Sequence, residues 1–275
     1  MSQAFSLERT HTVPNVDALF RLGRPIFAAA IMAFGVETLV CARWATHSLG
    51  PRYNVIPVLP WLPAIPCVAY LFGLVWIACG AGLLVQRWAR LSALTLGTLL
   101  FVCTIVLEVP KNAANIGSVP LRTMVFEPLA LACLAWLMPA LGSIPPLLER
   151  YSRYLLAIAF LAFGVDHFLA LQFIADLIPN WVPWHTFWVA FFGVVFIAAA
   201  ASFVLNFLVR WAAAGAGLMF AIWVVTLHVP WVMGVFAFPQ ARPNNPNGWS
   251  SLFIAIALWG GLWALARDRQ ATEKN

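Results

Sequence analysis

Charge is scarce in this sequence. Of its 275 residues, 9% are Asp, Glu, Lys or Arg, whereas 63% are hydrophobic. Soluble globular domains carry about 25% charged and roughly 45–50% apolar residues, so the composition excludes that class. The mean hydropathy of +0.87 indicates a polytopic helical membrane protein instead.

Cysteine pairs and catalytic motifs are also missing. The five cysteines form no C-x-x-C motif and are scattered through apolar runs, which is typical of small core residues and argues against a thiol–disulfide relay. We find no Ser-His-Asp order, zinc-ligand spacing or nucleotide fingerprint, and no basic patch interleaved with aromatic residues. Nucleic acid is therefore not an expected partner, and no metal is assigned.

A cleavable signal peptide is absent from the start of the sequence. Residues 1–24 mix polar and charged side chains and lack an early apolar core. We expect them to form a cytoplasmic or interfacial segment, with the first apolar run acting as its own uncleaved signal.

Long apolar runs are what the sequence has in abundance. A helix of about 20 apolar residues spans the bilayer core of roughly 30 Å. Eight runs of about this length are present, at residues 25–46, 66–86, 91–110, 121–141, 154–173, 184–206, 211–232 and 249–266.

Lys and Arg are distributed unequally between the loops that join these runs. Eleven lie in the N-terminal segment, the loops after the second, fourth and sixth runs, and the C-terminal tail, against five on the opposite side. Cytoplasmic loops carry the excess of Lys and Arg, so both termini are predicted to be cytoplasmic in a bacterial inner membrane. The net charge of +6 is then expected to contact anionic lipid.

The chain resembles itself at an offset of 120 residues. Residues 61–73 (WLPAIPCVAYLFG) match 181–193 (WVPWHTFWVAFFG), and LEVP at 107–110 matches LHVP at 227–230. One four-helix unit that occurs twice explains these matches.

The predicted fold is therefore all-α, with eight transmembrane helices in two four-helix bundles. The first half covers residues 25–146, the second half covers 147–267, and a cytoplasmic tail follows at 268–275. Each half has an even number of spans, so both halves insert in the same orientation, as parallel repeats.

Three motifs of the second half carry a family resemblance. They are Gly164-Val165-Asp166-His167, the segment Ile-Pro-Asn-Trp-Val-Pro at 178–183, and Gly193 in the following aromatic helix. They are similar to motifs of the DoxX-like superfamily. The resemblance implies a four-helix unit in each half and an association with membrane redox systems, among them quinone-linked sulfur oxidation, oxidative-stress complexes and the biogenesis of redox enzymes.

Ionisable residues inside the apolar runs are the candidate site residues. A charge at the centre of a membrane helix costs about 2.5–3.5 kcal/mol on insertion scales, so each one invites a functional interpretation. Glu37 and Asp166 follow the same Ala-Phe-Gly-Val phrase, 129 residues apart. With a rise of about 1.5 Å per residue, one layer in the outer half of the bilayer holds Glu37, Glu108, Glu127, Asp166, His167 and His228.

Four roles are open for this layer, one of which is the docking of a partner protein. Acids and imidazoles suit proton transfer or the headgroup of a quinone. Two His and one carboxylate also match a known metal-ligand set, the least favoured alternative. Hydrogen bonds between helices are the structural alternative, with Glu37 paired to Arg43 or His47 and Glu108 to Lys111.

The leading hypothesis is an auxiliary membrane subunit of a respiratory or other redox system, whose outer-half pocket binds a quinone or docks a membrane or periplasmic redox protein. Asp166, His167 and His228 are its polar contacts, with the three glutamates as a counterpart set and Trp181 of the outer loop as a further ligand-binding candidate. A non-enzymatic assembly factor or scaffold is the main alternative. A small-solute transporter is disfavoured, because the inner halves of the runs hold almost no ionisable residues. Whether the protein is an enzyme stays open.

Overall fold

The computed structural model describes residues 16–41, 66–115, 117–138, 145–234 and 246–273, and within these ranges the chain is helical with short turns and no strand. The predicted all-α class is confirmed for this part of the chain. The longer helices are α2 (Gly23–Cys41), α3 (Pro66–Leu84), α4 (Gln86–Cys103), α6 (Val119–Trp136), α7 (Pro146–Leu169), α9 (His185–Leu205), α10 (Val209–Trp223) and α12 (Pro246–Glu273). Short helices are α1 (Val16–Phe20), α5 (Val109–Asn112), η2 (Ala113–Asn115), α8 (Leu171–Ala175) and α11 (Val229–Val232).

Six helical stretches among the described residues are long and apolar enough to cross a membrane. Two of the eight predicted spans fall outside this set: α3, whose described apolar part is the shorter stretch Tyr70–Leu84, and α6, which contains Arg122 and Glu127. The six spans are Ala18–Val40, Gln86–Glu108, Pro146–Leu169, His185–Leu205, Val209–Val232 and Gly248–Arg267.

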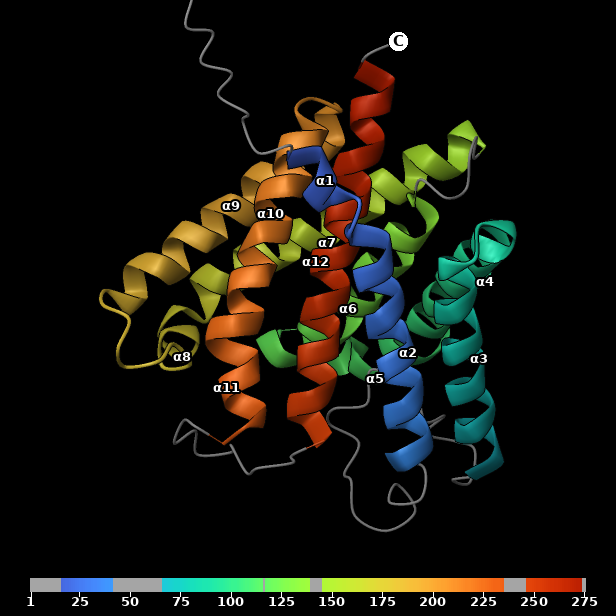
Figure 1. Cartoon of the computed structure of the whole chain (residues 1–275). Helices are drawn as coiled ribbons and strands as arrows, with labels where there is room; N and C mark the ends of the chain where they lie inside the picture. The colour runs from blue at the N-terminus through green and yellow to red at the C-terminus, as the bar shows by residue number, and fades with distance from the viewer. Residues whose placement is uncertain (1–15, 42–65, 116, 139–144, 235–245, 274–275) are drawn as a thin grey trace, which may run out of the picture.

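The longer helices pack in a closed ring that follows the order of the chain. Each one contacts the next along the sequence, and α12 contacts α2, which closes the ring. Figure 1 shows α12 between α2 and α10. In addition, α6 and α12 contact each other. The fourth helix of each half thus lies against the first helix of the other half, α6 against α7 and α12 against α2.

One buried hydrophobic cluster runs through both halves. It includes Phe27 and Leu134 of the first half and Phe160, Phe196 and Leu258 of the second, each of which is at most 2% exposed. Large apolar side chains also cover the outside of the molecule, where a soluble protein would carry charge. The two halves therefore share one core, and the exposed apolar surface suits contact with lipid.

Glycines allow the first two helices of each half to approach closely. A Cβ built on Gly35 of α2 would lie 2.6 Å from the Gly73 carbonyl oxygen and 2.6 Å from Ile77 Cγ1 of α3. A Cβ on Gly164 of α7 would lie 2.9 Å from the Gly193 carbonyl oxygen and 2.6 Å from Ile197 Cγ1 of α9. Small residues at such contacts are typical of helix pairs in membranes.

The third long helix of each half ends in a π-helical turn. The turns are η1 (Thr104–Glu108) after α4 and η4 (Val224–His228) after α10, and each is followed by Val-Pro. A proline ring clashes with the carbonyl four residues earlier and cannot donate to it, so a wider turn before Pro110 and Pro230 relieves the conflict. The last residues of the two turns are Glu108 and His228, both candidate site residues.

Candidate functional site

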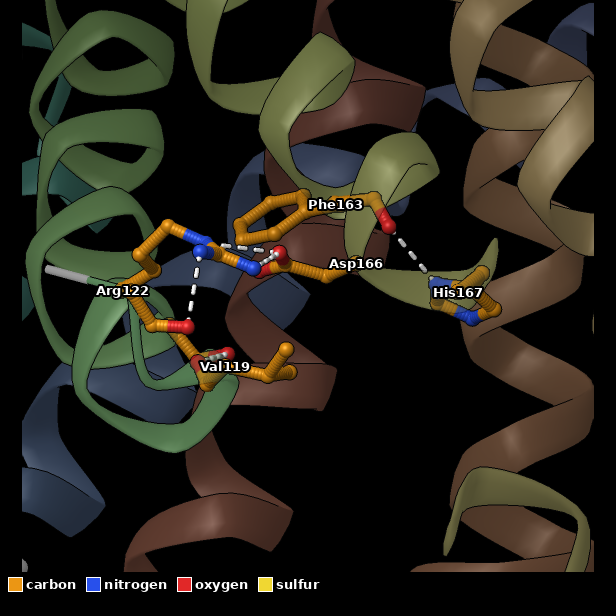
Figure 2. A network of polar contacts seen from close by, with 7 residues as sticks. Val119, Arg122, Phe163, Asp166 and His167 are labelled. Atoms are coloured by element: carbon orange, nitrogen blue, oxygen red, sulfur yellow. Dashed lines mark hydrogen bonds and ion pairs between the residues drawn. The ribbon is translucent and has the colours of Figure 1, made fainter. Parts of the chain in front are cut away.

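Asp166 and His167 are adjacent in α7, yet their side chains point to different neighbours. Consecutive residues of an α-helix are rotated by about 100°. Figure 2 shows Asp166 directed at Arg122 of α6, while His167 points away from that pair. The ring contacts of His167 are with Phe196 of α9 and Trp223 of α10. The structure therefore separates two residues that were predicted to share one pocket.

Asp166 belongs to an ion pair that joins the two halves. Arg122 donates from Nε to Asp166 Oδ1 over 2.8 Å, and its Nη2 donates to the same oxygen. Arg122 also donates from Nη1 to the Gly117 carbonyl oxygen at 3.1 Å. The side chains are 16% and 4% exposed, so the pair is largely shielded from water. Removal of either side chain would leave the other charge buried without its partner. Loss of this contact between α6 and α7 is therefore expected to destabilise the protein.

Glu37 makes the corresponding contact on the other side of the ring. Ser250 of α12 donates from Oγ to Glu37 Oε1 over 2.7 Å. Each acid of the repeated phrase therefore binds a side chain near the start of the fourth helix of the opposite half. Arg43 and His47, the predicted partners of Glu37, lie outside the described residues.

Glu108 is 1% exposed at the end of η1. Asn112 donates from Nδ2 to Glu108 Oε2 at 3.1 Å and to its carbonyl oxygen at 2.8 Å. The predicted pairing of Glu108 with Lys111 stays a prediction, because the structure does not describe the Lys111 side chain. Glu127 lies further along α6, and no hydrogen bond joins it to the described part of the chain.

His167 is anchored at one ring nitrogen and unpaired at the other. Its Nδ1 lies 2.7 Å from the Phe163 carbonyl oxygen, one turn earlier in α7. Its ring centroid lies 5.1 Å from that of Phe196 and 5.9 Å from that of Trp223, with the Trp223 plane inclined by only 15°. The residue is 8% exposed, and Nε2 has no hydrogen-bond partner among the described residues.

His228 presents a second buried ring nitrogen. It ends η4, five residues after Trp223 in the sequence. Its Nδ1 is buried without a partner within the described ranges, and its ring lies 6.4 Å from that of Trp231. The printed ring contacts place the His167 imidazole beside Trp223 and the His228 imidazole beside Trp231.

Trp181 lies apart from these groups. Its side chain is 66% exposed in the loop before α9, as expected of an interfacial tryptophan. Nearby, Trp184, His185, Thr186 and Phe187 line an open hollow at the start of α9. The described residues contain no group of three His, Cys, Asp or Glu placed to hold a metal ion.

The sequence missed Arg122 and Trp223 as parts of these clusters. Arg122 is one of the five charges that the sequence analysis assigns to the loops opposite the cytoplasmic side, whereas the structure places it in α6, in contact with Asp166. Trp223 carried no signal beyond its position five residues before His228, because one more tryptophan in an apolar helix is usually core or interface.

A family model described as a domain of unknown function (DUF8561) matches residues 156–259, from within α7 to within α12. No curated protein matches the chain, and no solved structure matches it. The matched stretch contains Asp166, His167, Trp223 and His228.

Proposed function

We propose that this protein is a DoxX-like auxiliary subunit or partner of a membrane redox system, and that its second half binds a quinone-type lipid-soluble ligand. The observation that carries the proposal is the pair of buried, unpartnered imidazole nitrogens, His167 Nε2 beside Trp223 and His228 Nδ1 in η4, five residues after Trp223 in the sequence. Leaving a buried polar atom without a partner costs about 1–3 kcal/mol. A ligand that completes these hydrogen bonds recovers that free energy.

The surroundings of His167 suit a planar aromatic headgroup. The Trp223 centroid lies 5.2 Å from Phe192 and 5.9 Å from Phe196, so indole and phenyl rings line this part of α9 and α10. Aromatic rings at such distances attract one another in offset or edge-to-face arrangements. Pockets for small ligands commonly combine such apolar walls with a few polar groups.

Asp166 and Glu37 have a structural role in this proposal. Both are occupied by contacts between the halves, Asp166 with Arg122 and Glu37 with Ser250. Of the candidate residues, we therefore retain His167 and His228 as ligand contacts, and we add Trp223. We assign electron transfer to or from the bound ligand to a partner protein in the membrane or the periplasm.

The proposed architecture is eight spans in two parallel repeats, with both termini in the cytoplasm of a bacterial inner membrane. Support comes from the matching contacts of Gly35 and Gly164, from the π-helical turns η1 and η4 at corresponding places, and from the crosswise packing of the fourth helices. An ancestral single unit explains all three features.

The test is saturable binding of decylubiquinone and of its reduced form, decylubiquinol, to the full-length protein in lipid nanodiscs, with empty nanodiscs as the baseline. Trp223→Leu combined with His228→Ala is expected to weaken binding at least about tenfold, which corresponds to roughly 1.4 kcal/mol. Trp181→Leu is the matched control, because the same substitution in the exposed loop leaves the proposed site intact.

Two results contradict the proposal. One is wild-type binding no greater than that of empty nanodiscs. The other is a loss of binding in the double variant that only accompanies a loss of folded protein, as judged by size-exclusion chromatography. The second result favours the alternative function, a scaffold in which the buried polar residues hold helices together.

A further inference from the structure

The contact between His167 and Phe163 identifies the nitrogen that carries the hydrogen. A carbonyl oxygen can only accept a hydrogen bond, so Nδ1 at 2.7 Å from the Phe163 oxygen must be the donor. A neutral imidazole has a single N–H, which leaves Nε2 with a lone pair. The carboxylate of Asp166, the nearest anion in sequence, is directed to Arg122 on another side of α7 (Figure 2) and offers no hydrogen bond to the ring.

The lone pair of Nε2 faces apolar surroundings. His167 is more than nine-tenths buried, its ring contacts are Phe196 and Trp223, and no donor among the described residues reaches Nε2. A ligand that approaches this atom gains a hydrogen bond only if it brings a donor of its own. A carbonyl oxygen placed there would set one lone pair against another.

The corresponding position of the first half lacks this acceptor. Thr38, which follows Glu37 as His167 follows Asp166, donates from Oγ1 to the Phe34 carbonyl oxygen at 2.7 Å. Both residues therefore anchor to the carbonyl one turn earlier, but only His167 offers a second polar atom beyond the anchor. The acceptor is an added feature of the second half and not part of the shared helix contact.

We infer that the site at His167 selects a hydroxyl-bearing aromatic ligand, a phenol or the reduced quinol form, over the corresponding quinone or ether. This inference rests on the proposed function, and it adds the hydrogen-bonding class of the ligand. The ligand hydroxyl donates to His167 Nε2, while Trp223 and Phe196 provide its aromatic contacts.

The test compares two probes that differ only in the donor, 4-octylphenol and 4-octylanisole, so that no redox chemistry intervenes. Binding of each to the full-length protein in nanodiscs is measured by equilibrium dialysis and corrected for partition into empty nanodiscs. We expect the phenol to bind about tenfold more tightly than its methyl ether, the difference made by one buried hydrogen bond.

His167→Asn is the informative variant, because an asparagine amide nitrogen can replace Nδ1 as donor to Phe163, while its amide oxygen takes the place of ring carbon Cδ2 and no acceptor occupies the position of Nε2. It is expected to remove the preference for the phenol and to keep weak binding of both probes. Thr38→Ala is the matched control in the first half and is expected to keep the full preference.

The outcomes separate the two proposals. If the two probes, decylubiquinone and decylubiquinol all fail to bind above the baseline, the proposed function fails. If the phenol and the ether bind equally well to the wild-type protein, the ligand site stands and the inference about the donor is overturned. Persistence of the preference in folded His167→Asn also overturns it, since the acceptor would then be another atom. The comparison of the phenol with the ether on the wild-type protein tests the inference even if His167→Asn does not fold.

Discussion

At the scale of single residues, three acids and two imidazoles differ in the hydrogen bonds that they make to the protein. Asp166, Glu37 and Glu108 accept hydrogen bonds from Arg122, Ser250 and Asn112 respectively. His167 and His228 each keep a buried ring nitrogen without a partner in the described part of the chain. We therefore explain Asp166, Glu37 and Glu108 by helix packing, although Asp166 Oδ2 is also buried without a partner among the described residues, and we assign the two imidazoles to a ligand.

The Arg122–Asp166 pair gives a prediction about stability. Asp166→Asn leaves the Arg122 charge buried without its counter-charge, and Arg122→Gln does the converse, so each is expected to destabilise the protein by about 3–5 kcal/mol. The double variant Arg122→Gln/Asp166→Asn removes both charges and is expected to be more stable than either single variant. Thermal unfolding in detergent, followed by tryptophan fluorescence, measures the three midpoints.

Glu37→Gln is the control for this series at the opposite contact. An amide oxygen still accepts a hydrogen bond from Ser250, so the loss is expected to stay below about 1.5 kcal/mol, the net value of one hydrogen bond. Additive losses in the double Arg122 and Asp166 variant would contradict a direct ionic interaction between the two residues.

The sequence predicted the layer of these residues but not their partners. The repeated Ala-Phe-Gly-Val phrase and the helical rise predict a similar depth for Glu37 and Asp166, and the similar depth stays a prediction. The choice of Arg122 and Ser250 depends on which helix lies against which, and the order of spans along the chain does not contain that information. The divergence of Asp166 and His167 follows from helix geometry and was within reach of the sequence.

At the scale of helices, close packing depends on glycine and the π-helical turns depend on proline. The matched Gly73 and Gly193 were visible in the repeat, and the structure adds that each lies against the glycine that precedes the buried acid, Gly35 or Gly164. The π-helical turns η1 and η4 were not predicted, although Pro110 and Pro230 at their ends were the available signal.

A matched pair of glycine substitutions tests the helix contact. Gly164→Ala places a methyl group 2.6 Å from Ile197 Cγ1 and 2.9 Å from the Gly193 carbonyl oxygen, so it is expected to destabilise the protein by about 1–3 kcal/mol. Gly215→Ala in α10 meets no atom within 4 Å and is expected to be neutral or to stabilise by up to about 1 kcal/mol. Unfolding midpoints of the two variants provide the measurement, and equal midpoints would argue against a close α7–α9 contact.

At the scale of the whole molecule, the number of membrane crossings is the open property. Length and hydropathy identify six stretches among the described residues, whereas eight crossings also require α3 and α6. The ring supports the larger number, because α3 and α6 pack between helices that are long enough to span the bilayer. Arg122 and Glu127 lower the hydropathy of α6. The ion pair with Asp166 offsets part of the free-energy cost of placing the Arg122 charge in the membrane.

The turn between α3 and α4 distinguishes the two topologies. If α3 crosses the membrane, a reporter fused after Arg87 lies in the cytoplasm. If α3 does not cross, the reporter lies outside. We expect green fluorescent protein fused after Arg87 and after Asn275 to fluoresce, and alkaline phosphatase at the same positions to be inactive. An active phosphatase after Arg87 would contradict eight crossings.

The contact between α2 and α12 has a consequence for synthesis in the cell. Glu37 and Ser250 are 213 residues apart, while Arg122 and Asp166 are 44 apart. At about 5–20 residues per second, a ribosome takes roughly 10–40 s to reach Ser250 after Glu37, but only a few seconds to reach Asp166 after Arg122. The first helix to enter the membrane therefore waits for the last one to cover its acid. During that interval neither Ser250 nor the rest of α12 is available to Glu37.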